Sequence, residues 1–283
     1  MTIRDFNEET LTTEVLRRIQ TTADPRLRAV MASLVKHLHA FVREVRPSQE
    51  EWFAGIKFLT DTGHWCDDKR QEFILMSDTL GVSMLVDFIN YGKAGAATES
   101  TVLGPFYVEG PPELPLGASI VKPGTPGDPC VVSGSVRGTD GRPVAGAVLD
   151  VWECGGDGFY DVQKPQGTNL RARFRTGSDG TFHFRCVKPV SYPVPHDGPV
   201  GKMLRATGRH PMRPGHLHFM IDAPGCDKLV THLFVRGDEY LDSDAVFGVK
   251  DSLIVDFVRN AAGEYETHYD FVLKRAQPRA RAA

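Results

Sequence analysis

The sequence predicts an antiparallel β-sandwich over residues 101–283, preceded by an α-helical domain over residues 1–100. Two observations support this division. Before residue 100, apolar residues recur at steps of three and four, which is the period of an amphipathic helix. After residue 100, glycine and proline separate short runs of alternating or β-branched residues, a pattern typical of many short strands joined by turns. We therefore expect an all-β domain behind a helical one.

Local signals place three helices in the first part. Asp24 is a suitable N-cap for a helix over residues 24–45, since Pro25 follows it in the first turn. Ser48 and Glu51 have the spacing of a capping box and open the next helix. A third helix is expected over residues 67–90, although Gly81 lies inside it. The helix over 24–45 carries a long apolar stripe that favours a dimer interface, formed by Leu27, Val30, Met31, Leu34, Leu38, Phe41, Val42 and Val45.

The strands of the second part are expected where alternating or β-branched residues lie between turn signals. Asp140-Gly141 and Asp179-Gly180 are two of these turn signals. The expected strands cover residues 130–136, 146–153, 181–187, 216–221, 229–235 and 252–258.

Composition excludes several classes of protein. Of the 283 residues, 41% are hydrophobic and 24% are charged, which is ordinary for a globular protein. A formal net charge of −3 gives no basis for binding nucleic acid or an anionic membrane. No apolar run approaches the ~18 residues of a membrane-spanning helix. Because the first fifteen residues also carry charges where a signal peptide would be apolar, we expect a cytoplasmic protein.

The cysteines do not indicate a metal site or a disulfide framework. There are five of them, an odd number, with irregular spacing and no CxxC pair. We interpret them as reduced thiols that pack as small hydrophobic side chains. Any metal must be bound by other residues. The cysteines are Cys66, Cys130, Cys154, Cys186 and Cys226.

His216 and His218 lie inside an apolar run with strand character. Residues i and i+2 of a strand point to the same face, so both imidazoles can reach one ion. Two structural histidines are the alternative reading of the same pair. His37 and His39 have the same spacing but lie on a predicted helix, where their side chains diverge by about 200°. That second pair is expected at the surface.

Two tyrosines stand in loops that follow predicted strands. Tyr160 ends a glycine-rich segment, and Tyr192 lies between Ser191 and Pro193. Loops on a rigid scaffold often carry active-site groups. Each tyrosine taken alone is also compatible with an ordinary packed aromatic. Two phenolates together with two imidazoles would favour a trivalent ion over zinc, and such an ion would lower the phenol pKa below its usual value of about 10.

These residues resemble the intradiol ring-cleavage dioxygenases over nearly the whole chain. The order and spacing of four segments in the second part match that family, and the helical part is similar to its N-terminal dimerisation domain. The matching segments are LGPFY at 103–107, DVW at 150–152 leading to GFY at 158–160, SYP at 191–193 and RPGHLHF at 213–219. Gly215 stands where alanine is common in the family.

The resemblance implies a mononuclear Fe(III) centre, one per subunit, held by Tyr160, Tyr192, His216 and His218. It implies that an adjacent diol of an aromatic ring is the substrate and that dioxygen is inserted between the two hydroxylated carbons. Tyr192 would leave the metal and accept a proton, and Arg213 would stabilise negative charge on the ring. It also implies a homodimer formed through the N-terminal helices, with a lipid as a candidate ligand between them.

Within the family, the sequence most resembles the hydroxyquinol 1,2-dioxygenases, which act on benzene-1,2,4-triol and yield 3-hydroxy-cis,cis-muconate or its tautomer maleylacetate. The segments at 229–235 and 237–250 carry this resemblance, and His232 stands where catechol-cleaving relatives have glutamine. Asp78 would accept a hydrogen bond from the third hydroxyl group. The implied substrate-binding residues are Leu75, Asp78, Leu103, Gly104, Pro105, Phe106, Val194, Pro195, His232 and Val246. His183, His196 and His210 are assigned to surface or structural positions.

Three alternatives remain open from the sequence. A catechol or substituted catechol is the nearest alternative substrate for the same chemistry. A metal-free β-sandwich binding module is suggested by the segments at 136–148 and 179–182, but would not need paired loop tyrosines. A zinc hydrolase would need an acidic general base beside the two histidines. Visible colour separates the last two classes from a ferric dioxygenase, because only the ferric tyrosinate centre absorbs visible light, and comparing turnover of benzene-1,2,4-triol with that of catechol separates the two substrates.

Overall fold

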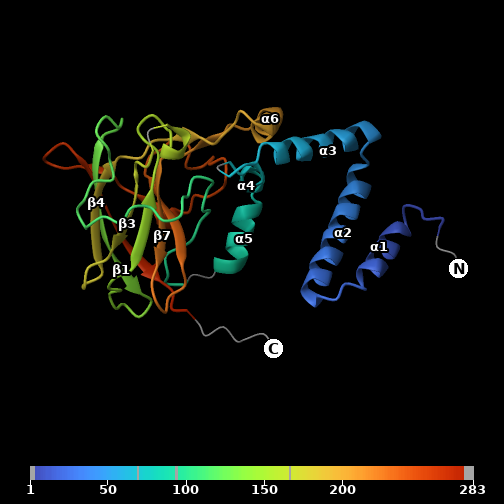
Figure 1. The fold of residues 1–283 in the computed structure, drawn as a ribbon, viewed down its shortest axis with the longest axis horizontal. Helices are drawn as coiled ribbons and strands as arrows, with labels where there is room; N and C mark the ends of the chain where they lie inside the picture. The colour runs from blue at the N-terminus through green and yellow to red at the C-terminus, as the bar shows by residue number, and fades with distance from the viewer. Residues whose placement is uncertain (1–3, 69, 93–94, 166, 277–283) are drawn as a thin grey trace. The chain divides into compact units, whose positions relative to one another are not determined.

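The computed structural model describes residues 4–68, 70–92, 95–165 and 167–276. The chain divides into two compact units, Met1–Thr60 and Asp61–Ala283 (Figure 1). We expected a limit near residue 100, where the sequence pattern changes. By its contacts, however, the chain between residues 61 and 100 belongs with the strands. Among the described residues, no helix combines the length and the apolar character needed to cross a membrane.

Two helices that start in the first unit, α2 (Pro25–Val45) and α3 (Gln49–His64), begin where the sequence signals predict. In α2, Asp24 Oδ1 accepts hydrogen bonds from the backbone N–H groups of Arg26 and Leu27, at 2.7 and 3.1 Å. In α3, Ser48 and Glu51 exchange the two bonds of a capping box, at 2.8 and 3.1 Å. The preceding helix, α1 (Leu11–Ile19), was not predicted and packs against α2.

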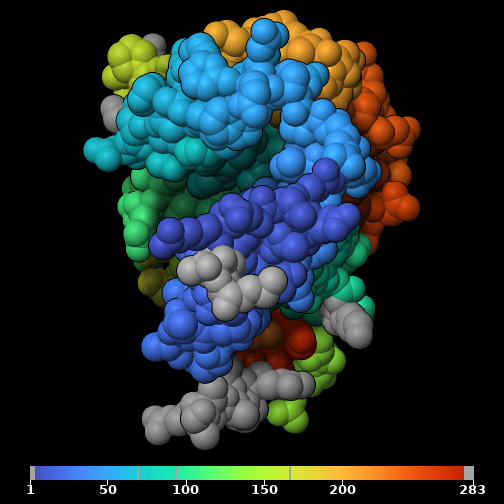
Figure 2. Space-filling view, turned by 90° about the vertical axis from the view of Figure 1, so that its right-hand side faces the viewer, coloured from blue at the N-terminus to red at the C-terminus, as the bar shows by residue number. Residues whose placement is uncertain are grey.

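The apolar stripe of α2 lies at the surface of the chain. Its eight residues are between 36% and 58% exposed, and no residue of α2 is buried. On α3, Trp52 and Phe53 are also more than half exposed. Figure 2 shows side chains of α3, in light blue, at the molecular surface. A large apolar patch at the surface of a protein is often a site at which it contacts another molecule.

The third predicted helix is two helices. α4 (Glu72–Thr79) and α5 (Val82–Tyr91) are separated at Gly81, which has a φ of 74°. This left-handed conformation is easily adopted by glycine and ends the run of helical backbone. The prediction of one helix over 67–90 was therefore wrong, and Gly81 is the physical reason.

The second unit is a β-sandwich, as predicted, with helices α4, α5 and α6 (Pro199–Ala206) in addition. One sheet has the strand order β10-β11-β1-β4 and the other β3-β2-β7-β8-β9. A short pair, β5-β6, stands apart from both. The strands are β1 (Pro129–Gly138), β2 (Val148–Trp152), β3 (Arg171–Arg175), β4 (Thr181–Val187), β5 (Tyr192–Pro193), β6 (Met212–Arg213), β7 (His216–Asp222), β8 (Leu229–Val235), β9 (Ile254–Val255), β10 (Val258–Arg259) and β11 (Tyr265–Leu273).

The sheets are not purely antiparallel. β1 pairs with β11 in parallel, and β8 pairs with β9 in parallel. The run expected as a strand at 252–258 is a short 3-10 helix (Asp251–Leu253) followed by β9 and β10. β3, β11 and α6 had no counterpart in the prediction. The residues of β3 nevertheless alternate arginine with apolar side chains, which is a strand pattern.

Aromatic and branched side chains from both sheets fill the sandwich. Phe219 of β7 lies with its ring centroid 4.8 Å from that of Phe271 of β11, and Phe174 of β3 stacks on Phe184 of β4 at 5.0 Å. Leu217 and Phe219 of β7 are both fully buried in this core. Since alternate residues of a strand face opposite sides, the histidines of β7 point out of the core.

Candidate metal centre and adjoining cavity

The centre begins with His216 and His218, which β7 directs to one face. Both side chains are at most 1% exposed. His218 lies opposite Trp152 of β2 in the strand register and stacks on its indole with ring centroids 4.6 Å apart. The two Nε2 atoms are 3.1 Å apart. Strand geometry therefore brings both imidazoles to one point, as the spacing predicts.

Tyr160 reaches the same point from a loop, and Tyr192 reaches it from the short strand β5. Tyr160 follows β2 and is held where its backbone N–H donates to Gln163 Oε1 at 2.9 Å. Tyr192 is anchored in β5, whose partner in the register is Arg213 of β6. Both phenols are at most 3% exposed, and their rings meet edge to face at 5.3 Å.

The four ligand atoms form a closed ring of short contacts. Tyr160 Oη lies 3.1 Å from Tyr192 Oη and 2.8 Å from His218 Nε2. Tyr192 Oη lies 3.4 Å from His216 Nε2, which lies 3.1 Å from His218 Nε2. Metal–ligand bonds of roughly 2.0–2.2 Å to oxygen and nitrogen require neighbouring ligand atoms at about this separation. The four side chains thus fit a single metal ion.

The histidines are set up as neutral ligands. His216 Nδ1 lies 2.7 Å from the Pro214 carbonyl and donates to it, so that Nε2 keeps its lone pair toward the centre. Burial lowers the pKa of His216 and His218 well below the usual 6.5. For His216 the nearby charge of Arg213 adds to this effect. Neither imidazole needs to lose a proton at neutral pH before it can bind a metal.

The phenols, in contrast, need a cation to ionise. Burial raises the pKa of Tyr192 to about 12, although the positive charge of Arg213 lowers it in part. Burial, with Tyr192 beside it, raises the pKa of Tyr160 well above 10. Two buried phenols beside neutral imidazoles form a donor set suited to a hard, highly charged ion.

Arg213 adds a fixed positive charge beside this ring. Its Nη1 lies 3.1 Å from His216 Nε2, and it makes a buried ion pair with Asp244. Burial alone would lower the pKa of Arg213, but Asp244 and Tyr192 raise it. The guanidinium therefore stays charged at every pH at which the protein is folded.

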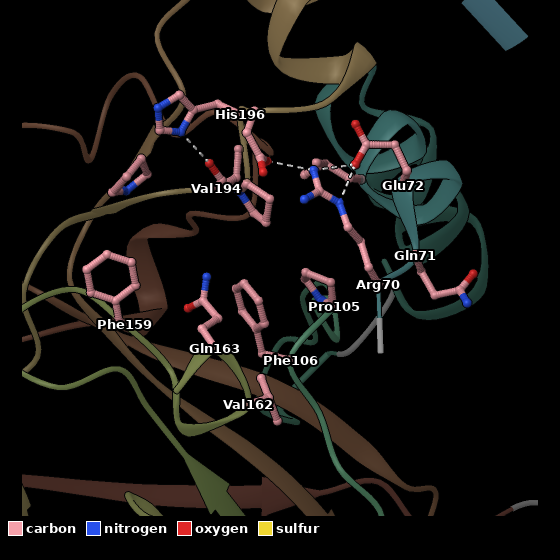
Figure 3. A pocket seen from close by; sticks show the side chains of 14 residues that line it. Arg70, Gln71, Glu72, Pro105, Phe106, Phe159, Val162, Gln163, Val194 and His196 are labelled. Carbon is pink, nitrogen blue, oxygen red and sulfur yellow. Dashed lines mark hydrogen bonds and ion pairs between the residues drawn. The ribbon is translucent and has the colours of Figure 1, made fainter. Parts of the chain in front are cut away.

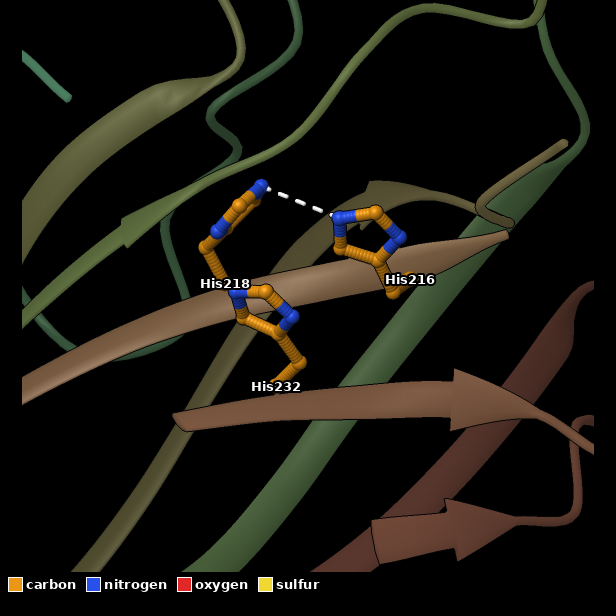
Figure 4. Close-up of side chains that lie close together, drawn as sticks. All are labelled: His216, His218 and His232. Atoms are coloured by element: carbon orange, nitrogen blue, oxygen red, sulfur yellow. Dashed lines mark hydrogen bonds between the residues drawn. The ribbon is translucent and has the colours of Figure 1, made fainter. Parts of the chain in front are cut away.

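His232 is the third imidazole of this region. It lies opposite His218 in the β7–β8 register, and its ring centroid is 4.1 Å from that of His218 and 4.6 Å from that of His216. The candidate ligand atoms of the three histidines all lie within 4.8 Å of one another (Figure 4). His232, which the resemblance implies as a substrate-binding residue, packs against both His216 and His218 and is fully buried.

A cavity of about 370 Å³ opens in the second unit and is lined by five of the implied substrate-binding residues (Figure 3). These five are Leu75, Pro105, Phe106, Val194 and Pro195. Phe106 also stacks on the Tyr160 ring at 4.4 Å, which connects the cavity wall to the candidate metal centre. A space of this size suits a single aromatic ring.

The other implied residues lie elsewhere. Asp78, Leu103 and Gly104 line a second hollow of about 470 Å³, which also borders the candidate metal centre, because a Cβ atom at Gly104 would lie 3.4 Å from His218 Cε1. Val246 is buried in an apolar cluster with Leu75 and Val194, directly behind the first cavity. The sequence analysis did not name the other residues of the cavity wall as substrate-binding. Those residues are Arg70, Gln71, Glu72, Phe159, Val162, Gln163, Pro193, His196 and Asp197. His196, assigned to a surface or structural position, is an exposed residue of this wall. Phe159, Val162, Gln163 and Pro193 had a signal, their closeness in sequence to Tyr160 or Tyr192.

The fold and this site can now be compared with known proteins. A family model described as catechol dioxygenase N terminus matches residues 24–98, and one described as dioxygenase matches residues 102–275. The chain belongs to this family of dioxygenases.

Individual relatives and a solved structure are also similar to this chain. The chain is 54% identical to a 6-chlorohydroxyquinol 1,2-dioxygenase of Cupriavidus pinatubonensis, over 96% of this chain and 99% of the relative. It is 55% identical to a hydroxyquinol 1,2-dioxygenase of Nocardioides simplex, over 90% of this chain and 87% of the relative. The solved structure of hydroxyquinol 1,2-dioxygenase from Pseudomonas putida DLL-E4 is similar with a TM-score of 0.88 and 48% identity, over 95% of this chain and 99% of that one.

Proposed function

We propose that this protein is an intradiol dioxygenase that cleaves benzene-1,2,4-triol, with iron(III) as its metal. The observation that carries this proposal is the closed ring of two phenol oxygens and two imidazole nitrogens in a chain more than half identical to hydroxyquinol 1,2-dioxygenases. The reaction breaks the bond between the two adjacent hydroxylated carbons and adds one atom of dioxygen to each of them, so that both become carboxyl groups. The expected product is 3-hydroxy-cis,cis-muconate or its tautomer maleylacetate.

Iron(III), held by Tyr160, Tyr192, His216 and His218, would supply the Lewis acid that binds the diol and makes its ring reactive toward dioxygen. The chain's own groups do the rest. Tyr192 Oη accepts a proton from the diol. Arg213 places a permanent positive charge where negative charge builds up on the ring. The apolar walls at Leu75, Phe106 and Val194 exclude water from the substrate.

Absorption spectroscopy tests the metal and the substrate together. The purified protein is expected to be red-brown, and its visible band should shift when benzene-1,2,4-triol is added without oxygen. Admitting oxygen should then consume one molecule of dioxygen per triol. A colourless, iron-free protein would contradict the metal assignment, and a clear preference for catechol in kcat/KM would contradict the substrate.

The carboxyl group of Asp78 is proposed to select the third hydroxyl group. Asp78 is 3% exposed, and burial raises the pKa of its carboxyl group while a bond from Ser83 and the charge of Arg213 lower it. We expect Asp78→Asn to reduce kcat/KM for the triol by about 10–100-fold relative to catechol, since sites built around one such hydrogen bond reject analogues that lack it. Asp68→Asn, at an exposed position just before the same helix, is the matched control. An unchanged ratio of triol to catechol would refute this role.

The same substitution should affect stability with a defined sign. A buried carboxyl group with a raised pKa binds its proton more readily in the folded state, so the wild-type protein gains stability as pH falls through that raised value. Asp78→Asn is therefore expected to match or exceed the wild-type Tm at neutral pH. Thermal melts in a pH series should show this advantage shrinking toward acidic pH. An advantage that grows on acidification would contradict the assignment.

The helices of the first unit are proposed to form a homodimer, with a lipid as a further candidate ligand between them. The exposed stripe of α2 supports this, because none of its apolar side chains is buried among the residues that the structure describes. Light scattering at micromolar concentration should give the mass of two chains, and Leu38→Glu should reduce it toward the 31.2 kDa of one. A monomeric wild-type protein would rule out the dimer. The cytoplasmic location also stays a prediction.

A further inference from the structure

The guanidinium of Arg213 is held along one edge. Its Nε donates to Asp244 Oδ1 at 3.0 Å and its Nη2 donates to Asp244 Oδ2 at 3.2 Å, while Nη1 lies at His216 Nε2. Both partners of the ion pair are only 2% exposed. An arginine fork that is bound on two nitrogens by one carboxylate has a fixed plane. The remaining nitrogen is thereby aimed at the ring of ligand atoms.

Asp244 is itself fixed by the backbone of a tight turn. Its Oδ1 also accepts from the N–H of Val246 at 3.3 Å, and its Oδ2 accepts from the N–H of Gly248 at 2.9 Å. The carboxylate thus receives four hydrogen bonds, two from Arg213 and two from the turn. Since those two N–H groups belong to the backbone of the turn that carries Asp244, the turn itself fixes the position of the carboxylate.

Gly248 packs directly against the ion pair. A Cβ atom added at residue 248 would lie 3.0 Å from Arg213 Nη2 and 3.2 Å from Asp244 Oδ2. The Gly248 carbonyl accepts from Thr101 Oγ1 at 2.8 Å, which ties the turn to another segment. The bond from Thr101 therefore holds the turn in place, and the close approach of Gly248 restricts the guanidinium on the side of Nη2.

We propose that Asp244 is a positioning residue for Arg213, acting on turnover through the orientation of the guanidinium and touching neither substrate nor metal. This proposal rests on the proposed function. Arg213 keeps its charge without Asp244, but the direction of its free nitrogen would then be set by solvent and neighbouring side chains. A misdirected donor stabilises developing charge poorly while changing ground-state binding less.

Asp244→Asn is the first test. An amide of the same shape has only one acceptor atom for four donors, so the fork should lose its fixed plane. We expect kcat for the triol to fall by about 30–100-fold and KM to change by less than about threefold. Iron content and the affinity for triol without oxygen, measured from the visible band, should stay close to wild type. In the metal-free protein, the nuclear magnetic resonance signal of the Arg213 Nε–H should shift and exchange faster with water.

Gly248→Ala tests the same idea without removing any charge or hydrogen-bonding group. Its Cβ would press on Arg213 Nη2, so kcat should fall by about tenfold. This variant also decides the question if Asp244→Asn does not fold. Asp87→Asn is the matched control, because Asp87 pairs with Lys250, two residues beyond Gly248, in another buried ion pair at 3.1 Å. It loosens the same loop without touching Arg213 and should leave kcat within about twofold of wild type.

A double-substitution cycle separates positioning from general damage. If Asp244 acts through Arg213, then Asp244→Asn should cost less than about threefold in kcat when added to Arg213→Lys, whose ammonium lacks the fork. If the falls in kcat caused by the two substitutions multiply in the double variant, the two residues act independently and the proposal is overturned. Values of kcat within twofold of wild type for both Asp244→Asn and Gly248→Ala, or an equal loss in Asp87→Asn, would also overturn it. A wild-type protein that cannot cleave the triol would contradict the proposed function instead.

Discussion

Replacing His218 with alanine is expected to give a folded protein that contains almost no iron and has no measurable ring-cleaving activity. His218 Nε2 lies 2.8 Å from Tyr160 Oη and 3.1 Å from His216 Nε2, so it connects the two halves of the donor ring. Removing a residue that only hydrogen-bonds to a metal ligand, without touching the metal itself, lowers metal affinity by roughly 10–100-fold. Loss of the ligand itself should cost considerably more.

Metal analysis of the purified variant measures this effect directly. We expect less than about a tenth of the wild-type iron and no red-brown colour. His268→Ala is a suitable control because His268 is an exposed histidine on β11, in the other sheet. Full iron occupancy in His218→Ala would show that the ligand assignment is wrong, whatever the activity of the variant.

Replacing Tyr192 with phenylalanine is expected to separate metal binding from turnover. The resemblance implies that Tyr192 leaves the metal when the diol binds, so its loss should weaken iron binding less than the loss of His218. Proton transfer by a positioned side chain is worth about 10²–10⁴-fold in rate. We therefore expect partial iron occupancy and a kcat at least a hundredfold below wild type, per iron bound.

The spectrum and the rate must be measured on the same preparation. Loss of one of the two phenolates should weaken and shift the visible band, and the remaining band should report iron bound through Tyr160. Tyr269→Phe is the control, since Tyr269 donates to the Ser252 carbonyl at 3.2 Å and lies in the other sheet. Wild-type kcat per iron in Tyr192→Phe would refute the proton-accepting role.

Local signals predicted the parts of the fold that depend on a few neighbouring residues. The capping residues Asp24 and Ser48 marked the starts of α2 and α3, and the β-branched runs marked β1, β4, β7 and β8. Pairing between strands was not predictable in the same way. The parallel pairing of β1 with β11 depends on which segments meet across the sandwich, and nothing in either strand alone encodes its direction.

The candidate site followed the same rule. Alternate residues of a strand point to the same face, so the spacing of His216 and His218 alone predicted that their imidazoles lie close together. Tyr160 lies in a loop and Tyr192 in the short strand β5, far apart in the sequence, and only the resemblance implied that both contact the same metal as the histidines. Residues such as Arg70 and Asp197 line the cavity because α4 and the loop before α6 meet there. Contacts of that kind between distant segments have no signature in the sequence.

The place of β11 has a consequence for how this protein is made. β1 needs β11 on one side, and the two strands hydrogen-bond through residues 135 positions apart, as in the pair of Ser135 and Asp270. Until β11 has left the ribosome, the edge of β1 that later pairs with it has backbone N–H and C=O groups without hydrogen-bond partners. A strand of another nascent chain can pair with these groups. Chains that stop before Tyr265 should therefore aggregate, and the sheet that contains β1 should be completed only once β11 has been synthesised.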